Sequence, residues 1–475
     1  MTAQFKINPS RSYVREGFFV YITELRGKLI ITGDDFVDNY SAPVSVWDAY
    51  SKGKKFKKLS GDITTDVLIV GAGIAGLLTA YFLTQRGVNC VVAEKGRICQ
   101  GTTHNTTAKI TSQHGLIYHE LLSRRGKEYA EKYYKINQLS ILEYKKLSEI
   151  YDCEFEIKDN YVYSLTDRGL LEAEAKALDE IGADFEFCDN VQLPVDTVGA
   201  VKFPNQAQFN PLKLLALLSE KLNIYEDTFV TKIHKNIAEA PGGNIKADKI
   251  IVATHFPMVN IHGSYPLKLY QSRSYVIALS NAQRLNGMYM DESGYGLSFR
   301  NYNDYLLLGG GAHRTGSAGG NYQILRKFAN KYYPYATEEY HWSAQDCMSL
   351  DGVPYIGRYC ALTPSLYVAS GFNKWGMTSS MTSALILSDL VCHKENQYAN
   401  VFNPSRSMLT PQLALNAGEA IKNLLTFSGK RCTHLGCSLK WNKLEHSWDC
   451  PCHGSRFDEN GTVLENPAKK DLDVG

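Results

Sequence analysis

The sequence predicts an α/β domain built on a parallel sheet, interrupted by an inserted antiparallel β-sheet domain and followed by a small cysteine-rich domain. Three observations support this order. A strand–helix–strand unit with a glycine-rich turn occupies residues 66–93. Short alternating stretches dominate residues 267–310, as expected of antiparallel strands inserted between βαβ elements. Four cysteines fall between Cys432 and Cys452, near the C-terminus.

Composition narrows the classes of protein to consider. The 475 residues suffice for two or three domains. A net charge of +2 gives no reason to expect nucleic acid or an anionic membrane as partner. No apolar run reaches the roughly 18 residues of a transmembrane segment, and residues 1–11 lack the apolar core of a secretory signal. We therefore expect a cytoplasmic protein whose scattered cysteines are reduced thiols.

The strand–helix–strand unit carries the first motif. Residues 66–70 form a β-branched run typical of a buried parallel strand, residues 74–85 predict a helix, and residues 88–93 predict a second buried strand. Gly71, Gly73 and Gly76 between the first strand and the helix fit the pattern G-x-G-x-x-G. In this context the pattern indicates a Rossmann-like dinucleotide-binding domain rather than a glycine turn without a ligand.

Each residue of the motif has a physical role. Gly71 permits the tight turn, Gly73 lets the backbone approach a pyrophosphate, and Gly76 lets the helix pack closely on the strand. The diphosphate is expected at the helix N-terminus, where amide donors and the helix dipole favour anions. Glu94, at the end of the second strand, is expected to accept hydrogen bonds from the adenosine ribose.

The remaining elements are placed more coarsely. Residues 1–60 stay unassigned, with short strands possible at 18–22 and 29–31. Helices are expected at residues 170–181, 211–221 and 378–392, and strands at 223–233, 249–254, 274–279, 295–300, 305–308 and 366–369.

The C-terminal cysteines form the second motif. Cys432 and His434 make C-x-H, fifteen residues follow, and Cys450 and His453 make C-x-x-H. Such a group predicts a metal site or a local disulfide framework. Zinc held by two cysteines and two histidines is one interpretation, but each loop here carries one residue of each type and an additional cysteine, unlike the usual finger.

Five segments carry a resemblance to a known family. They resemble the FAD-dependent oxidoreductases of the D-amino-acid oxidase and glycine oxidase type, and they are residues 94–103, 106–114, 250–254, 351–357 and 369–378. The resemblance covers roughly residues 44–395. It implies FAD as the cofactor and hydride transfer from a C–N or similar bond to the flavin.

From the motif and the resemblance together we expect a set of FAD-binding residues. They are Gly71, Gly73, Ile74, Ala75, Gly76, Glu94, Lys95, Gly101, Thr102, Thr103, Thr107, Ala108, Val230, Ala253, Thr254, Gly371, Gly376, Met377 and Thr378.

The cysteine-rich segment closely resembles Rieske proteins, which carry a 2Fe–2S cluster. The resemblance implies that Cys432 and Cys450 hold one iron, that His434 and His453 hold the other, and that Cys437 and Cys452 form a disulfide. It also implies that Ser455 donates a hydrogen bond to a cluster sulfur. Where high-potential respiratory members have a tyrosine, this chain has Phe457. One hydroxyl donor fewer predicts a midpoint potential below the respiratory range.

These expectations give a domain plan. Residues 1–60 are an N-terminal extension without assignment. Residues 61–152, 201–262 and 346–395 form the FAD-binding domain, and residues 153–200 and 263–345 form the α+β substrate domain. Residues 396–427 are a linker, and residues 428–475 are a minimal all-β Rieske subdomain that leans on the flavoprotein for stability.

Members of the family often bind the substrate carboxylate with an arginine and shape the pocket with aromatic residues. The candidates here are Arg273, Tyr275, Arg300, His313, Lys374 and Trp375. Relatives of the sarcosine oxidase type have a lysine near the flavin that promotes reaction with oxygen. The matching strand, residues 306–309, lacks a lysine, so the resemblance favours a dehydrogenase over an oxidase.

The sequence thus predicts an FAD-dependent dehydrogenase of an amine or amino-acid-like substrate. Its electrons are expected to pass through the Rieske cluster to an external acceptor protein or quinone. The alternative is a relay or redox sensor without an organic substrate, in which flavin and cluster exchange electrons between two proteins.

Overall fold

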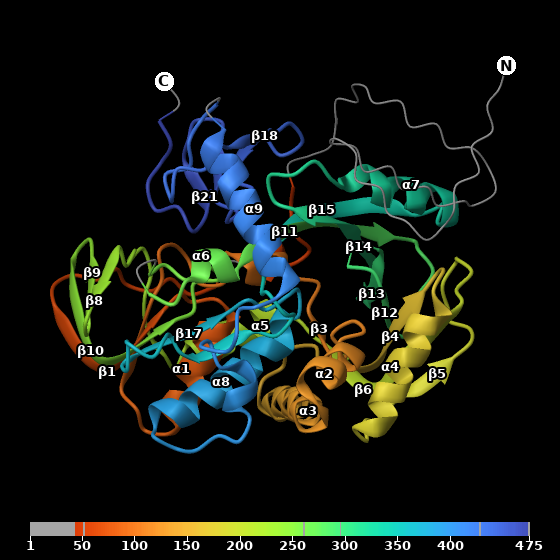
Figure 1. Ribbon diagram of the computed structural model, residues 1–475, viewed down its shortest axis with the longest axis horizontal. Helices are drawn as coiled ribbons and strands as arrows, with labels where there is room; N and C mark the ends of the chain where they lie inside the picture. Colours follow the sequence, from red (N-terminus) through yellow and green to blue (C-terminus); the bar gives the residue numbers. More distant parts are fainter. Residues whose placement is uncertain (1–42, 51–52, 260–261, 295, 427–428, 474–475) are drawn as a thin grey trace. The chain divides into compact units, whose positions relative to one another are not determined.

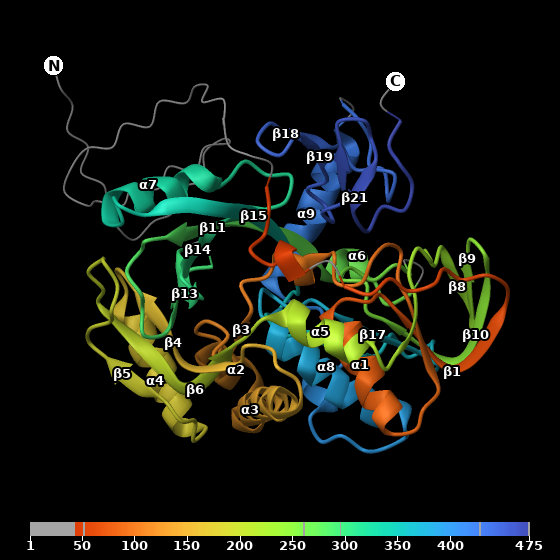
Figure 2. The ribbon, with the colours of Figure 1, turned by 180° about the vertical axis from the view of Figure 1, so that it is seen from behind.

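The computed structural model describes residues 43–50, 53–259, 262–294, 296–426 and 429–473, and every structural statement below refers to these residues. The strands predicted at 18–22 and 29–31 lie outside them. The described strands form sheets of eight, nine and four strands, which Figures 1 and 2 show from opposite sides. Within the described ranges, no helix combines the length and the apolar composition needed to cross a membrane.

The first sheet contains the predicted strand–helix–strand unit. β1 (Ile63–Val70) runs parallel to β2 (Cys90–Ala93) on one side and β10 (Gly243–Val252) on the other. The strand order is β16-β17-β10-β1-β2-β7, with β8 and β9 attached beside β10. The other strands are β7 (Asn223–Tyr225), β8 (Lys232–His234), β9 (Ile237–Ala240), β16 (Tyr355–Arg358) and β17 (Leu366–Ser370).

Helices bury this sheet. α1 (Ile74–Gln85) packs against α8 (Gly376–Val391) and α5 (Pro211–Ser219), and α8 also contacts α3 (Lys127–Ile150). Most residues of α1 and α8 are buried all round, as expected of core helices. Further helices are η1 (Asp48–Tyr50), η2 (Thr102–Asn105), α2 (Tyr118–Arg125), α4 (Arg168–Glu180), α6 (Tyr265–Lys268) and η3 (Ala399–Phe402).

The second sheet is largely antiparallel, in the order β15-β11-β14-β13-β12-β4-β6-β3, with β5 beside β6. Its strands are β3 (Lys109–Ile110), β4 (Glu156–Ser164), β5 (Glu186–Cys188), β6 (Gly199–Gln208), β11 (Tyr270–Ser280), β12 (Met288–Asp291), β13 (Ser298–Tyr302), β14 (Tyr305–Arg314) and β15 (Thr337–Met348). α7 (Tyr322–Tyr332) packs against β11 and β14. β3 and most of β6 fall in ranges that the sequence assigned to the FAD-binding domain, and the domain limits themselves stay predictions.

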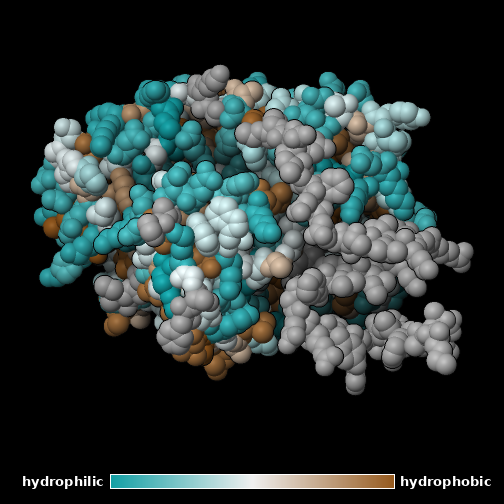
Figure 3. All heavy atoms as spheres, turned by 90° about the horizontal axis from the view of Figure 1, so that it is seen from above, coloured by the Kyte–Doolittle hydropathy of each residue, from teal (hydrophilic) through white to brown (hydrophobic). Residues whose placement is uncertain are grey.

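The third sheet forms the C-terminal domain, preceded by α9 (Pro411–Leu425). It contains β18 (Lys440–Asn442), β19 (Ser447–Asp449), β20 (Arg456–Asp458) and β21 (Val463–Glu465). α9 starts at Pro411, and the Thr410 hydroxyl accepts a hydrogen bond from Leu413 N–H at 3.3 Å, as an N-cap should. In Figure 3 the described surface is mainly hydrophilic with scattered hydrophobic atoms, as is normal for a globular protein.

Candidate functional site

The glycine turn between β1 and α1 has the geometry that only glycine allows. Gly71 has φ of +106°, and a Cβ on it would lie 2.5 Å from the carbonyl oxygen of Ala253. A Cβ on Gly76 would lie 2.0 Å from the carbonyl oxygen of Gly71. Both positions therefore exclude a side chain, and the turn fits the close approach of backbone to a dinucleotide.

Polar side chains order the loops around the start of α1. The Thr103 hydroxyl accepts a hydrogen bond from Ile74 N–H at 3.1 Å. The Glu94 carboxylate accepts from the N–H groups of Ala72 and Gly96 at 2.7 and 3.1 Å. Burial raises the pKa of Glu94, and these amide donors oppose that rise. Gly73 caps α1 without a side chain, so the positive end of the helix dipole is left for an anionic ligand.

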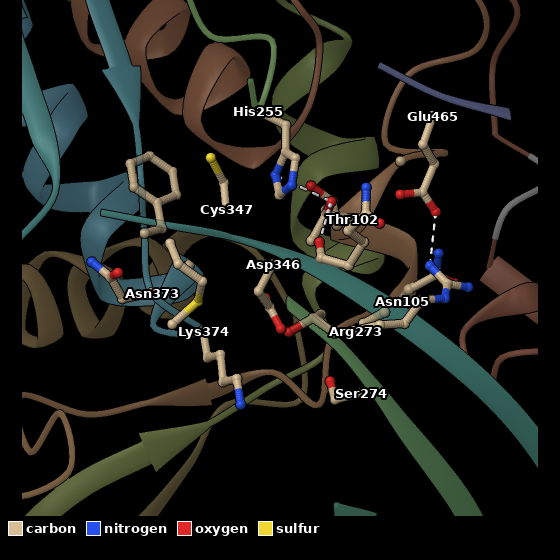
Figure 4. A pocket seen from close by; sticks show the side chains of 18 of the residues that line it. Thr102, Asn105, His255, Arg273, Ser274, Asp346, Cys347, Asn373, Lys374 and Glu465 are labelled. Atoms are coloured by element: carbon tan, nitrogen blue, oxygen red, sulfur yellow. Dashed lines mark hydrogen bonds and ion pairs between the residues drawn. The ribbon is translucent and has the colours of Figure 1, made fainter. Parts of the chain in front are cut away.

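One cavity of about 1890 Å³ joins this turn to the second sheet and the C-terminal domain (Figure 4). It is larger than the roughly 300–1,000 Å³ of ordinary small-molecule pockets, so it has room for a dinucleotide and a second ligand. All of the predicted FAD-binding residues line it except Gly76, Ala108 and Thr378. The structure thus brings most of these residues together, and their individual binding roles stay predictions.

Residues 43–50, which the sequence left unassigned, support a loop of this cavity. The Trp47 ring nitrogen donates to the Thr106 carbonyl at 2.7 Å, and the Ser45 hydroxyl donates to the His104 carbonyl at 2.9 Å. Val44 forms an isolated bridge with His341 of β15. No sequence pattern signals these contacts, because they join segments far apart in the chain.

The paired strands β11 and β15 present two different faces. Val276, Ala278 and Trp342 pack in the hydrophobic core of the first domain. Tyr275, Ile277 and Leu279 pack in a separate core that includes α7. Because side chains alternate along a strand, neighbouring residues of β11 belong to opposite faces.

Arg273 lies on the face that meets the C-terminal domain. Its Nε donates to Glu445 at 2.6 Å, its Nη1 donates to Glu465 at 3.0 Å, and its Nη2 contacts the Ser343 hydroxyl at 2.5 Å. Tyr275 donates to Glu445 at 3.2 Å. The Arg273 side chain is only 4% exposed. Sequence reasoning expected a substrate-binding arginine; the structure places Arg273 in an ion-pair network between two domains.

Arg456 of β20 completes this network. Its guanidinium donates to Glu445 at 2.8 Å, Asp449 at 2.9 Å and Glu465 at 3.1 Å. Burial alone would raise the pKa of Glu445, but Arg273 and Arg456 hold it at about 2. The carboxylate is therefore ionised at neutral pH and held by two guanidinium groups.

Two other candidates do not line the cavity. Arg300 is 1% exposed, and its Nη1 donates to the carbonyls of Thr107 and Ala108 at 2.7 and 2.8 Å. His313 contacts the Tyr275 hydroxyl at 3.1 Å and the Arg314 carbonyl at 3.0 Å. Arg300 thus supports the loop that carries the predicted FAD residues Thr107 and Ala108, and the expected catalytic roles of both residues stay predictions.

Lys374, Trp375 and His114 line the cavity near the start of α8. The Trp375 and His114 rings stack with centroids 4.9 Å apart, and burial lowers the pKa of His114 to about 3, which keeps it neutral. Lys374 Nζ donates to the Gly294 carbonyl at 2.7 Å. Lys109 also lines the cavity, and burial lowers its pKa to about 7. The cavity therefore contains lysines, although β14 does not supply one.

The four expected cluster ligands lie on two loops of matching geometry. In the first, Cys432 N–H donates to Cys437 O at 2.8 Å, and in the second, Cys450 N–H donates to Ser455 O at 2.9 Å. Gly436 and Gly454 both have φ of +78°. The rings of His434 and His453 lie with centroids 5.0 Å apart. The loops thus bring two thiols and two imidazoles together.

The donor set fits a metal cluster. Both ring nitrogens of His434 and the Nδ1 of His453 are buried without a hydrogen-bond partner among the described residues. Burial lowers the pKa of His434 to about 3, so it is a neutral donor at pH 7. Buried polar atoms are normally satisfied, and a bound metal accounts for these. The expected ligand roles nonetheless stay predictions.

The predicted disulfide is not formed. Cys437 and Cys452 are free thiols, although their Sγ atoms and that of Cys450 lie within 4.8 Å of one another. A disulfide requires sulfur atoms about 2.05 Å apart, so proximity alone does not support the pairing. The Ser455 side chain interacts with the Cys432 thiol, its expected hydrogen bond to a cluster sulfur stays a prediction, and Phe457 is fully buried beside the cysteines.

The cluster loops dock onto the first two sheets. Phe256, shortly after β10, packs edge-on against both His434 and His453 with ring centroids 6.0 Å away. Arg314 donates to the carbonyls of Pro451 and Cys452 at 2.9 and 3.2 Å. The Gly454 backbone packs so closely on Gln271 of β11 that a Cβ on Gly454 would lie 2.2 Å from Cγ of Gln271. The histidine side of the cluster site therefore faces the dinucleotide domain.

Comparisons with known proteins match both parts of the chain. Residues 66–390 match the FAD dependent oxidoreductase family, and residues 393–474 match the Rieske [2Fe-2S] domain. The Rieske 2Fe-2S iron-sulfur protein YhfW of Bacillus subtilis is 35% identical, over 91% of this chain and 97% of that protein.

Solved structures resemble the flavoprotein part. Glycine oxidase from Geobacillus kaustophilus superposes with a TM-score of 0.62 at 20% identity, over 72% of this chain and 99% of that one. L-proline dehydrogenase from P. horikoshii also gives 0.62, at 17% identity, over 74% and 98%. At these identities the likeness is one of fold.

Proposed function

The chain belongs to the family of FAD-dependent oxidoreductases and ends in a Rieske [2Fe–2S] domain, and we propose that it is a dehydrogenase of an amine or amino-acid-like compound. It passes the electrons through its Rieske cluster to an external acceptor, a protein or a quinone. FAD and the 2Fe–2S cluster are its cofactors. When bound, FAD takes two electrons from a C–N bond and the cluster carries one at a time.

The observation that carries the proposal is the shared cavity. It runs from the glycine turn at Gly71 to residues of the Rieske domain such as Glu445 and Glu465, with the second sheet as one wall. A cavity of about 1890 Å³ leaves space beside a dinucleotide for an organic substrate. This supports the enzyme over a relay that works without a substrate.

The docked cluster loops support electron transfer within one chain. Phe256 lies between the end of β10, whose following residues Ala253 and Thr254 line the cavity, and the histidines His434 and His453. Asn466 of the Rieske domain donates to the Thr254 carbonyl at 2.6 Å. The polypeptide thus holds the proposed FAD site and the cluster site against each other.

The substrate class rests on the resemblance in fold. The similar structures include a glycine oxidase and an L-proline dehydrogenase, both named for oxidation of an amino acid. The cytoplasm is the proposed location, and the cysteines support it because none of the eleven forms a disulfide in the described structure.

The test is anaerobic addition of a panel of amines and amino acids to the purified protein. We expect one compound class to bleach the flavin absorbance and to produce the EPR signal of a reduced Rieske cluster. The matched control is Cys432→Ser, which removes an expected ligand. In that variant the flavin should still bleach and the EPR signal should be absent. Bleaching without an EPR signal in the wild-type protein would contradict transfer to the cluster.

A further inference from the structure

We propose that Asp346 binds the protonated amino group of the substrate, and that the site selects a cationic amine without a neighbouring carboxylate. This inference deepens the proposed function and rests on it. No residue of the predicted site supplies this role, because Asp346 belongs neither to the glycine motif nor to the cluster motif.

Asp346 lies on β15, on the face turned toward the dinucleotide domain. β11 and β15 pair in continuous register at this end, with Ser272 opposite Asp346, Ser274 opposite Ala344 and Val276 opposite Trp342. Val276 and Trp342 pack in the core of the first domain, and the Trp342 ring nitrogen donates to the Asn105 carbonyl at 3.0 Å. Strand alternation therefore places Asp346 on the same side.

The Asp346 carboxylate has no partner in the described structure. No described side chain or backbone group forms a hydrogen bond or ion pair with it, although the residue is part-buried and lines the cavity. Figure 4 shows the carboxylate projecting into the pocket between the Lys374 and Arg273 side chains. A carboxylate that is partly withdrawn from water and has no hydrogen bond from the protein is available to a cationic ligand that enters the cavity.

The charges around Asp346 leave it available. Burial raises the pKa of Asp346, and the charges of Lys374, His255 and Arg273 oppose this rise. Lys374 is the strongest of these, but its Nζ donates to the Gly294 carbonyl and makes no ion pair with Asp346. Arg273 is held by Glu445 and Glu465 on the opposite face.

The same arrangement disfavours a substrate carboxylate. Arg273, the cation most suited to a bidentate contact, already has two carboxylate partners. A carboxylate next to the amino nitrogen would also come close to Asp346, and like charges repel each other. An ammonium group gains an ion pair with Asp346 and carries no such penalty.

The experiment uses two ligands that share a tert-butyl group and carry opposite charges. tert-Butylammonium has no hydrogen on the carbon next to nitrogen, so it can bind but cannot be oxidised, and pivalate is its anionic counterpart. Binding to the holoprotein is followed by perturbation of the flavin absorbance. We expect tert-butylammonium to bind, pivalate to bind at least tenfold more weakly, and Asp346→Asn to raise the Kd of the cation about 10- to 100-fold.

Glu292→Gln is the matched control. Glu292 is a second carboxylate that lines the cavity, and burial raises its pKa to about 7. It differs from Asp346 because the Ser164 hydroxyl donates to its Oε1 at 2.8 Å, whereas its Oε2 is buried without a partner among the described residues. We expect this variant to bind the cation as the wild-type protein does. FAD content and the cluster EPR signal confirm that both variants are folded.

Several outcomes overturn the assignment. They are absence of cation binding, a preference for pivalate, an unchanged Kd in Asp346→Asn, and a loss in Glu292→Gln instead. The proposed function is tested separately with oxidisable compounds. If α-amino acids bleach the flavin and simple amines do not, the dehydrogenase stands and the amine assignment falls. If the cation binds through Asp346 but no compound bleaches the flavin, the result contradicts the proposed oxidation and supports the cation site.

Discussion

The two faces of the β11–β15 strand pair hold their charges in different ways. On the face toward the Rieske domain, Arg273 is bound by Glu445 and Glu465. On the face toward the dinucleotide domain, Asp346 has no partner among the described residues, although Arg273 and Asp346 both line the cavity. Both sets come from adjacent positions of the same strands, since Arg273 lies opposite Gln345 and Ser272 lies opposite Asp346.

The difference separates charges that hold domains together from charges that are available to a ligand. A buried charge with hydrogen-bonded partners is satisfied within the protein. Removing one partner leaves the other charges unpaired in a low-dielectric environment, which is costly. A part-buried charge without protein partners remains available to a ligand that enters the cavity. Composition and motif cannot distinguish the two, because both are single charged residues on strands.

Arg273→Met removes the ion pairs of Arg273 with Glu445 and Glu465 on the face toward the Rieske domain. Glu445 and Glu465 then share only Arg456, and we expect the free energy of unfolding in urea to fall by about 3–5 kcal/mol. The control is Arg284→Met, since Arg284 is 65% exposed and pairs with Asp304 at 3.5 Å. Its loss should stay within about 0.5 kcal/mol. Equal stability of both variants would show that the network does not hold the Rieske domain.

Acid tests the same face without a mutation. Glu445 has its pKa lowered from 4.5 to about 2 in the folded protein, so its ionised form stabilises the fold above the unfolded pKa. That contribution is lost as the pH falls from about 4.5 to 2. We expect wild type to lose about 3 kcal/mol more than Glu445→Gln over this range. Parallel pH profiles of urea unfolding would contradict the ionised network.

A smaller change compares the two faces directly. The Ser343 hydroxyl contacts Arg273 and Glu445 at 2.5 and 3.2 Å, so Ser343→Ala should cost about 1 kcal/mol of stability. Ser274 lines the cavity on the other face, and its hydroxyl has no partner in the described structure. Ser274→Ala should change stability by less than about 0.5 kcal/mol. Thermal or urea unfolding of the pair checks this, and a reversed order would disprove the facial assignment.

A change that touches neither face should alter only the cluster. Phe457 is fully buried beside the cysteines, and Phe457→Tyr adds a hydroxyl donor. We expect the midpoint potential to rise by about 20–60 mV, the equivalent of one net hydrogen bond. Phe457→Leu adds no donor and should leave the potential near that of wild type. Redox titration monitored by EPR measures both, and a wild-type value near +300 mV would contradict the sequence-based prediction.

Local motifs were predictable, and contacts between distant segments were not. Gly71, Gly73 and Gly76 identify their turn because the strand and helix that they join are adjacent in the chain. The expected cluster ligands likewise sit on two short loops. The family comparisons confirm the FAD-binding and Rieske assignments.

The substrate side could not be derived in the same way. Arg273 was chosen as a substrate-binding cation because an arginine on a strand of the inserted sheet suits that role. In the structure Arg273 pairs with Glu445, which is 172 positions away, and only tertiary folding brings the two together. Asp346 was overlooked because a single aspartate between Gln345 and Cys347 forms no recognisable sequence pattern. Only the folded structure shows that its carboxylate has no protein partner.

The fusion of the two domains has a kinetic consequence. α9 leads directly into the first cluster loop, and Arg314 holds the second loop through Pro451 and Cys452. A domain tethered and docked in this way stays at a high effective concentration beside its donor. Electron handover inside the chain should therefore be first order, with the same rate in dilute and concentrated solution. Because the Arg273 pairs are buried, added salt should slow it little.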